Sequence, residues 1–187
     1  MFSRLFKRTS HERTVAGLYG RIVAQARETG FFAVANVPDT VEGRFELVAL
    51  HAWLVMRRLR DQGPEAAAFN QALFDFMFAD MDLNLRELGV SDMKVGEKVK
   101  DLASHFYGRI NAYEGAMKPD AAPDALAQAL DRNLYGSTLP DPADVATMEA
   151  YVRAQAAALD SFPPARLLAE RWPSPRLQAR HTRNSQE

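Results

Sequence analysis

Apolar side chains recur at helical spacing between Phe69 and Gly89, and they do so on two sides of the predicted helix. One set falls within an arc about 100° wide, which is the pattern of a helix that faces a core. This set comprises Phe74, Met77, Phe78, Met81, Leu85 and Leu88. The second set lies on the opposite side and comprises Phe69, Ala72, Phe76, Ala79 and Leu83. The pattern therefore predicts either a central helix covered by its neighbours, which is the simpler interpretation, or a helix that offers one face to another protein.

The same periodicity predicts helices along most of the chain. They run over residues 10–29, 40–62, 64–89, 91–117, 124–135 and 142–159, and a short turn follows Pro163–Pro164 and holds Leu167, Leu168 and Trp172. The apolar connection from Gly30 to Pro38 is expected to fold back onto the helices, because its side chains would be costly in water. No pair of strands is visible, so the sequence predicts an all-α fold: a single globular domain of six to seven helices.

Capping signals set the predicted helix ends. Ser10, Asp39 or Thr40, and Asp141 stand where a side-chain oxygen accepts from the first free amides. Pro64 and Pro142 fit the first helical position, where a missing N–H group is harmless. Gly30, Gly89 and Gly136 stand where helices end. Asp39, Gly43 and Arg44 are interpreted as structural, with Gly43 in a close approach.

Composition limits the class of protein. The chain has 187 residues and no cysteine, so one domain fits and disulfides or thiolate chemistry are excluded. The longest nearly uncharged run, Leu47 to Met56, is interrupted by His51 and is far shorter than the roughly twenty residues of a membrane span. His51 is interpreted as a hydrogen-bonded core histidine. The predicted parts are a basic N-terminal segment at 1–9, the helical domain at 10–172 and a disordered tail at 173–187.

Charge is distributed unevenly around a net value of −1. Residues 1–28 carry +4 and residues 166–187 carry +3, so the residues between them carry −8. The N-terminal apolar and basic side chains predict a short helix that contacts a membrane surface. These membrane-contact residues are Phe2, Arg4, Leu5, Phe6, Lys7 and Arg8. They lack the apolar core of a secretory signal, so the expected location is cytoplasmic, with peripheral contact on the inner face of the cytoplasmic membrane.

Motifs that carry chemistry are missing. The four histidines are spread singly, without the spacing that places two metal ligands on one helix face. Asp80 and Asp82 resemble a metal-binding pair, but two residues apart on a helix they point about 160° away from each other. Phosphate-binding, nucleophile and nucleic-acid motifs are absent as well. We therefore expect no catalytic residues, no metal, no cofactor and no specific nucleic-acid partner.

Four blocks of sequence resemble the ubiquinol-cytochrome c chaperone family. They are Leu18–Val23, Val37–Leu47, Phe78–Asp82 with Arg86–Val90, and Phe106–Arg109. The resemblance implies a non-enzymatic, all-helical assembly factor for ubiquinol-cytochrome c reductase that binds newly made cytochrome b or another subunit of that complex. Mitochondrial members resemble chaperones that act beside the ribosome exit with a small helical partner; whether this chain contacts the ribosome is left open. The chain lacks their long targeting extension, so it looks like a bacterial cytoplasmic member.

A chaperone for a bundle of apolar helices needs an exposed apolar groove with polar rims. The hypothesis places this groove on the central helix and the helix of Phe106. Its partner-binding residues are Phe76, Asp80, Asp82, Leu83, Arg86, Phe106, Tyr107 and Arg109. Helix ends and internal salt bridges explain the charged members equally well. Two other functions stay open: an α-helical enzyme acting on an apolar, isoprenoid-like small molecule, and a general helical adaptor.

Overall fold

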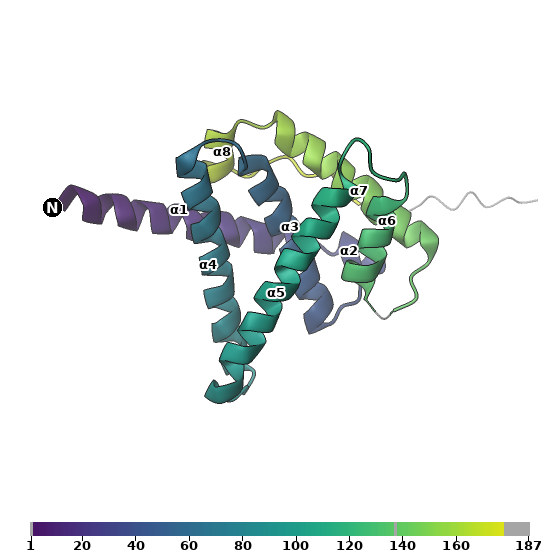
Figure 1. Ribbon diagram of the computed structural model, residues 1–187, viewed down its shortest axis with the longest axis horizontal. Helices are drawn as coiled ribbons and strands as arrows, with labels where there is room; N and C mark the ends of the chain where they lie inside the picture. The colour runs from purple at the N-terminus through teal and green to yellow at the C-terminus, as the bar shows by residue number, and fades with distance from the viewer. Residues whose placement is uncertain (1, 137, 178–187) are drawn as a thin grey trace, which may run out of the picture.

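Helices make up nearly all of the regular structure of this chain (Figure 1). The computed structural model describes residues 2–136 and 138–177, with side chains from residue 11 onward. The elements are α1 (Phe2–Ala26), α2 (Gly30–Ala33), α3 (Val41–Leu59), α4 (Pro64–Glu87), α5 (Asp92–Ala116), α6 (Ala125–Leu130), the π-helical turn η1 (Asp131–Tyr135), α7 (Pro142–Ser161) and α8 (Pro164–Ala169). These residues contain no strand, so the prediction of an all-α domain is confirmed.

Most of the capping predictions are confirmed. The Thr40 hydroxyl accepts from the Gly43 amide at 3.1 Å, and the Asp141 carboxylate accepts from the Ala143 amide at 2.8 Å. Gly89 ends α4 at a φ of 82°, in the left-handed region that favours glycine. A Cβ atom at Gly43 would lie only 2.0 Å from the Pro38 carbonyl oxygen, which confirms the close approach predicted there.

Two predicted helix ends are wrong. The backbone of α1 is helical from Phe2, so Ser10 lies inside the helix instead of capping it. Residues 2–9 contain neither proline nor glycine, and nothing local therefore stops the helix at Ser10. At its other end α1 stops at Ala26, and Gly30 begins the one-turn helix α2.

The core forms where α3 crosses α1 and α7. Every residue of α3 from Ala49 to Val55 is buried, which agrees with its apolar sequence on all sides. Full burial of a side chain such as Leu50 contributes about 1.5–3 kcal/mol relative to exposure. Phe31 and Val37 are also buried, so the connection after α1 folds back onto the helices as predicted.

The C-terminal segment is ordered further than predicted. The sequence placed a disordered tail at 173–187, but residues 173–177 lie against the helices. Gln155 of α7 donates to the Pro173 carbonyl oxygen at 3.3 Å and accepts from the Ser174 hydroxyl at 2.7 Å. Side-chain hydrogen bonds of this kind are not visible in a proline-broken sequence. Residues 178–187, the rest of the predicted tail, lie outside the described residues.

Helices α4 and α5 converge and project together from the body (Figure 1). Between residues 79 and 105 only Val95 is buried, among side chains that are all described. We call residues 76–107, the distal half of α4 and the facing half of α5, the arm. None of the helices in the described part of the chain combines the length and hydropathy needed to cross a membrane.

Candidate functional site

The second apolar face of α4 is covered at one end and open at the other. Near the start of the helix, Phe69 is buried and stacks edge-on against His11 of α1, with ring centroids 5.4 Å apart. Further along, Phe76 is 39% exposed and Leu83 is 54% exposed. We call Phe76, Ala79 and Leu83 the outer strip, because they share one side of the helix and run outward from the contact of Phe76 with α1. The outer strip is unused apolar surface.

Asp80 ties the arm to the body. The Tyr19 hydroxyl of α1 donates to the Asp80 carboxylate at 2.8 Å, and Asn84 donates to the same oxygen at 3.1 Å. Burial and this acceptor raise the pKa of the Tyr19 phenol. The Tyr19 ring also stacks edge-on against Phe76 at 5.4 Å. Asp80 is therefore a structural contact between α1 and α4, placed beside the outer strip.

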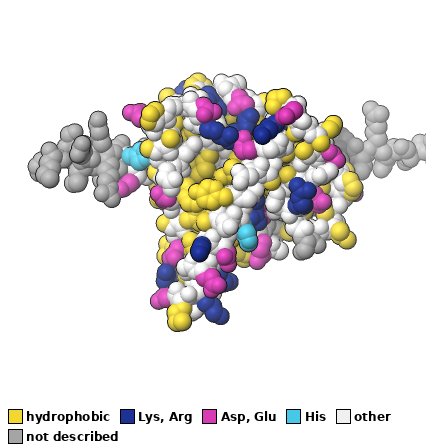
Figure 2. All heavy atoms as spheres, in the orientation of Figure 1, with side chains coloured by type: hydrophobic (Ala, Val, Ile, Leu, Met, Phe, Trp, Pro, Cys, Tyr) yellow, Lys and Arg dark blue, Asp and Glu magenta, His cyan; other side chains and the backbone are white. Residues whose placement is uncertain are grey.

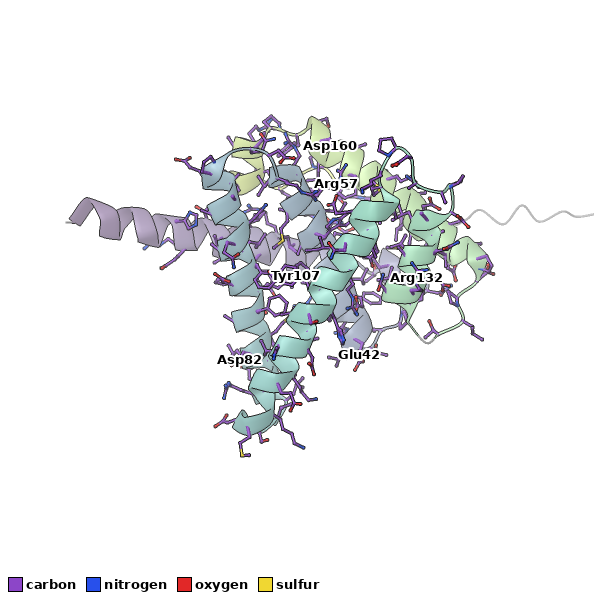
Figure 3. The ribbon with its side chains drawn as sticks, viewed as in Figure 1. Glu42, Arg57, Asp82, Tyr107, Arg132 and Asp160 are labelled. Atoms are coloured by element: carbon purple, nitrogen blue, oxygen red, sulfur yellow. The ribbon has the colours of Figure 1, made fainter. Side chains whose placement is uncertain are left out.

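Asp82 and Arg86 close the tip of the arm. Arg86 pairs with Asp82 one turn earlier on α4 and with Asp92 at the start of α5. The guanidinium group holds the pKa of the Asp82 carboxyl below its usual range. Asp92 is largely exposed and the other two side chains are partly exposed (Figure 3 labels Asp82), so these pairs hold the two helix ends together but contribute little to stability. Asp80 and Asp82 thus have different partners and do not converge on a common ligand.

Phe106 and Tyr107, although adjacent in sequence, have opposite surroundings. Phe106 is fully buried against Phe78, with ring centroids 5.9 Å apart. Tyr107 is 52% exposed, and the centroid of its ring lies 5.2 Å from that of Phe74. Figure 3 places Tyr107 between α4 and α5, and Figure 2 shows hydrophobic side chains gathered there on the visible face. We call Phe74 and Tyr107 the aromatic face.

Arg109 is partly buried, with 18% of its side chain exposed, and its contacts fit the second explanation offered for the charged residues, an internal salt bridge. Its guanidinium group forms a two-bond ion pair with Glu46 of α3, and the Glu46 side chain is only 9% exposed. The guanidinium also lies 5.9 Å from the centroid of the Phe45 ring. Burial raises the pKa of the Glu46 carboxyl, and the pair with Arg109 opposes that rise. This pair joins α5 to α3 and supports the base of the arm.

The eight predicted partner-binding residues therefore do not line one groove. Phe76 and Leu83 belong to the outer strip, whereas Tyr107 belongs to the aromatic face. Phe74 and Phe76 are two positions apart on α4, so these faces point about 160° away from each other. Phe106 is fully buried, Arg109 is partly buried against Glu46, and the other charged residues hold helices together. Phe69 and Phe106 are buried, whereas Phe76, Leu83 and Tyr107 stay exposed, so apolar surface remains open on two sides of the arm.

Two cavities lie away from the eight predicted partner-binding residues. One, of about 680 Å³, opens between α1, α3, α4 and α8 and is lined in part by Leu59, Phe69 and Leu168. The other, of about 620 Å³, lies between the end of α1, α2 and residues 175–177. Among the described side chains, no group of three or more His, Asp or Glu residues is arranged to hold a metal ion.

Two exposed apolar residues at the tip of the arm were not predicted from the sequence. Met93 is 93% exposed, and Leu88 is 66% exposed although the periodicity assigned it to the core face. Leu88 follows the last residue of α4, Glu87, as its C-cap, where an apolar period continues in the sequence although the side chain is exposed. The exposed position of Met93 could have been found from its place in the first turn of α5, which begins at Asp92. The side chains of the six predicted membrane-contact residues, Phe2 to Arg8, lie outside the described ones.

Comparison with known proteins gives consistent matches. The sequence model described as "Ubiquinol-cytochrome C chaperone" matches residues 33–176. The human protein "Ubiquinol-cytochrome c reductase complex assembly factor 1" is 28% identical over 146 residues, which cover 78% of this chain and 48% of that protein. The yeast "Protein CBP3, mitochondrial" from Saccharomyces cerevisiae is 29% identical over 109 residues, covering 57% of this chain and 32% of that protein.

A solved structure matches over most of its length. The crystal structure of the Cbp3 homolog from Brucella abortus superimposes with a TM-score of 0.76 at 37% sequence identity, covering 90% of this chain and 93% of that one. By contrast, this chain spans about half the length of the human relative (48%).

Proposed function

The chain belongs to the ubiquinol-cytochrome C chaperone family, and on that premise we propose that it is a non-enzymatic assembly chaperone for ubiquinol-cytochrome c reductase that binds newly made cytochrome b through the arm. The observation that carries the proposal is the exposure of Phe76, Leu83 and Tyr107 on a projecting pair of helices. The human relative is named an assembly factor of the ubiquinol-cytochrome c reductase complex. Cytochrome b as the client is our inference.

The chemistry of the arm suits an apolar helical client. A helix that is apolar on its surface gains by laying that surface against an apolar strip, in the way that amphipathic helices occupy grooves. The outer strip is flanked by charged and polar side chains, among them Asp80 and Asp82, which keep the free protein soluble. A client helix on the outer strip would leave the buried core of the body untouched.

Crosslinking from native membranes tests this function. A photoreactive amino acid at position 83 or 107 is expected to capture cytochrome b, whereas one at Leu139 is not. Leu139 is a matched control because it is fully exposed and lies in the connection between η1 and α7, outside the arm. The double variant Phe76→Ser/Leu83→Ser should lower cytochrome b recovery by about 10-fold or more, as expected for central interface residues.

Three results would count against the proposal. They are capture of cytochrome b from position 139 as efficiently as from position 83, recovery of other proteins but no subunit of the complex, and unchanged recovery in the double variant. A tightly bound apolar small molecule in place of cytochrome b would favour the enzyme alternative. Normal folding of the double variant, measured by circular dichroism, is the control.

The proposal includes peripheral contact with the inner face of the cytoplasmic membrane through residues 1–9. It rests on the composition of that segment, in which Phe2, Leu5 and Phe6 alternate with basic residues. Deleting residues 1–9 should weaken binding to anionic liposomes and leave binding to neutral liposomes unchanged. Equal binding of both proteins to anionic liposomes would remove this part of the proposal.

A further inference from the structure

The segment after α8 crosses the body as an extended strap, which we define as residues 170–177. Arg171 pairs with Glu28 at the end of α1 at 3.2 Å. Trp172 is only 4% exposed, so the strap is anchored by a large aromatic side chain. At its far end, Leu177 lies against Gly30 at the start of α2. The strap therefore bridges α8, α1 and α2 without being part of a helix.

Buried polar side chains form the floor beneath the strap. Gln25, His51, Tyr151 and Gln155 are each no more than 3% exposed. The Tyr151 hydroxyl lies 2.7 Å from His51 Nε2 and 3.4 Å from Gln25 Nε2. His51 Nδ1 lies 2.7 Å from the Leu47 carbonyl oxygen. Polar groups in a helical core are costly unless each finds a partner, so this cluster requires explanation.

The strap supplies partners for this floor. Gln155 uses both ends of its side-chain amide on the strap, donating to the Pro173 carbonyl oxygen at 3.3 Å and accepting from Ser174 Oγ at 2.7 Å. Ser174 Oγ also lies 3.4 Å from the Tyr151 hydroxyl. Gln155 thus bonds to a backbone carbonyl and to the hydroxyl of the following residue, which is how a side-chain amide can bind an extended peptide. The strap thus occupies its groove as a peptide ligand would.

The fit of the strap is incomplete. The buried Trp172 Nε1 donor finds no acceptor among the described residues, and an unmet buried donor is unfavourable because it has lost its hydrogen bonds to water. A cavity of about 620 Å³ remains beside residues 175–177, lined by Ala33, Val34 and the end of α1. Arg171 is 74% exposed, so its pair with Glu28 adds little. The strap is therefore packed incompletely, because one buried donor lacks an acceptor, a cavity remains beside it and its ion pair is exposed.

We propose that residues 170–177 are a releasable strap, and that the groove beneath them is a second docking site for an extended peptide that carries a large aromatic side chain followed by a hydroxyl residue. In the closed state the chain fills this site with its own Trp172 and Ser174. Release exposes the Gln155 amide and the place that Trp172 fills, so that a partner segment with a similar aromatic and hydroxyl pair can bind there. The site lies on the body and does not depend on the arm or on cytochrome b.

A disulfide lock tests the release. The chain has no cysteine, so a Gly30→Cys/Leu177→Cys variant would hold the only two thiols. A Cβ atom at Gly30 would lie 3.2 Å from Leu177 Cβ, near the spacing of about 3.8 Å across a disulfide. In the unmodified chain and the reduced variant, amides of residues 27–34 and 170–177 should exchange hydrogen well before those of α3. The oxidised variant should slow this exchange by about 10-fold or more.

Peptide binding tests the groove. A fluorescent peptide with the sequence of residues 170–177 is expected to bind the reduced variant at least about 10-fold more tightly than the oxidised one. Peptides carrying Trp172→Ala or Ser174→Ala should bind more weakly than the parent peptide. In the otherwise unmodified full chain, Ser174→Ala should strengthen binding of the parent peptide, because the competing strap is weakened.

Several outcomes would overturn the proposal. If oxidation leaves hydrogen exchange unchanged, the strap does not open separately from the core. If the peptide binds both redox forms equally, or neither, the groove is not the site. The unmodified chain under both redox conditions is the control. Neither readout uses cytochrome b, so failure here leaves the proposed chaperone function standing, and the converse also holds.

Discussion

Helix α3 and the distal half of α4 differ in how far neighbouring helices bury their side chains. Both are apolar on more than one side, yet every residue of α3 from Ala49 to Val55 is buried, whereas only Val95 is buried between residues 79 and 105. The difference comes from their neighbours: α1 and α7 cover α3, while the arm has only its own second helix beyond the crossing with α1. An apolar pattern on all sides thus indicates either an interior helix or an unused binding surface, depending on what crosses it.

The largest expected effect compares two adjacent residues of α5. Phe106→Ala should lower the free energy of unfolding by about 3–5 kcal/mol, because it removes a fully buried ring and leaves a cavity. Tyr107→Ala should lower the free energy of unfolding by only about 1 kcal/mol, because the half-exposed ring contributes mainly its contact with Phe74. Denaturant unfolding measures both. Equal losses would show that the aromatic face is part of the core.

A similar effect is expected where the arm joins the body. Arg109→Met leaves the Glu46 carboxylate buried without its partner, which should cost about 3–5 kcal/mol. The double variant Glu46→Met/Arg109→Met should recover most of that loss, because no buried charge remains. The matched control is Arg86→Met at the exposed tip, where chemical denaturation should detect almost no change. Additive losses in the double variant would contradict this account.

Acid should destabilise the body through His51. Burial lowers the pKa of this imidazole to about 4, and its hydrogen bond to the Leu47 backbone opposes the shift. Between the unperturbed value of 6.5 and about 4, the unfolded state binds more protons than the folded state. The free energy of unfolding should therefore fall by up to about 3 kcal/mol as the pH decreases through this window. Urea unfolding of the His51→Gln variant should lack this component.

The smallest expected effect concerns glycines of the arm. Gly89→Ala should lower the free energy of unfolding by about 1 kcal/mol, because a φ of 82° disfavours a residue with a side chain. Space is not the reason, since a Cβ atom there would meet no atom within 4 Å. Gly96→Ala, in the interior of α5 with equally open surroundings, should stabilise the arm by about 0.5–1 kcal/mol. Hydrogen exchange should locate both changes in residues 76–107. A matching change throughout α3 would mean that arm and body unfold as one unit.

Local signals predicted most of the fold. Thr40 and Asp141 as caps, Pro64 as a first helical residue and Gly89 as a terminator all act within one turn of their own position, so they are visible in the sequence. The burial and hydrogen bonding of His51 also followed from its apolar surroundings in the chain. The candidate site was predicted less well, because the pairing of Arg109 with Glu46 was not predicted and Leu88 was placed in the core.

The amino-acid sequence by itself determined that this chain is helical, where most of its helices begin and end, and which family it resembles, because these depend on dihedral preferences, caps and motifs of a few residues. Only the tertiary structure decided which half of the second face of α4 is covered, that Arg109 turns inward to Glu46, and that Trp172 and Ser174 close a polar groove. Each of these depends on a partner at least 19 positions away in the chain, the separation between Gln155 and Ser174. Such distant partners are chosen by the way helices cross, which no short stretch of sequence encodes.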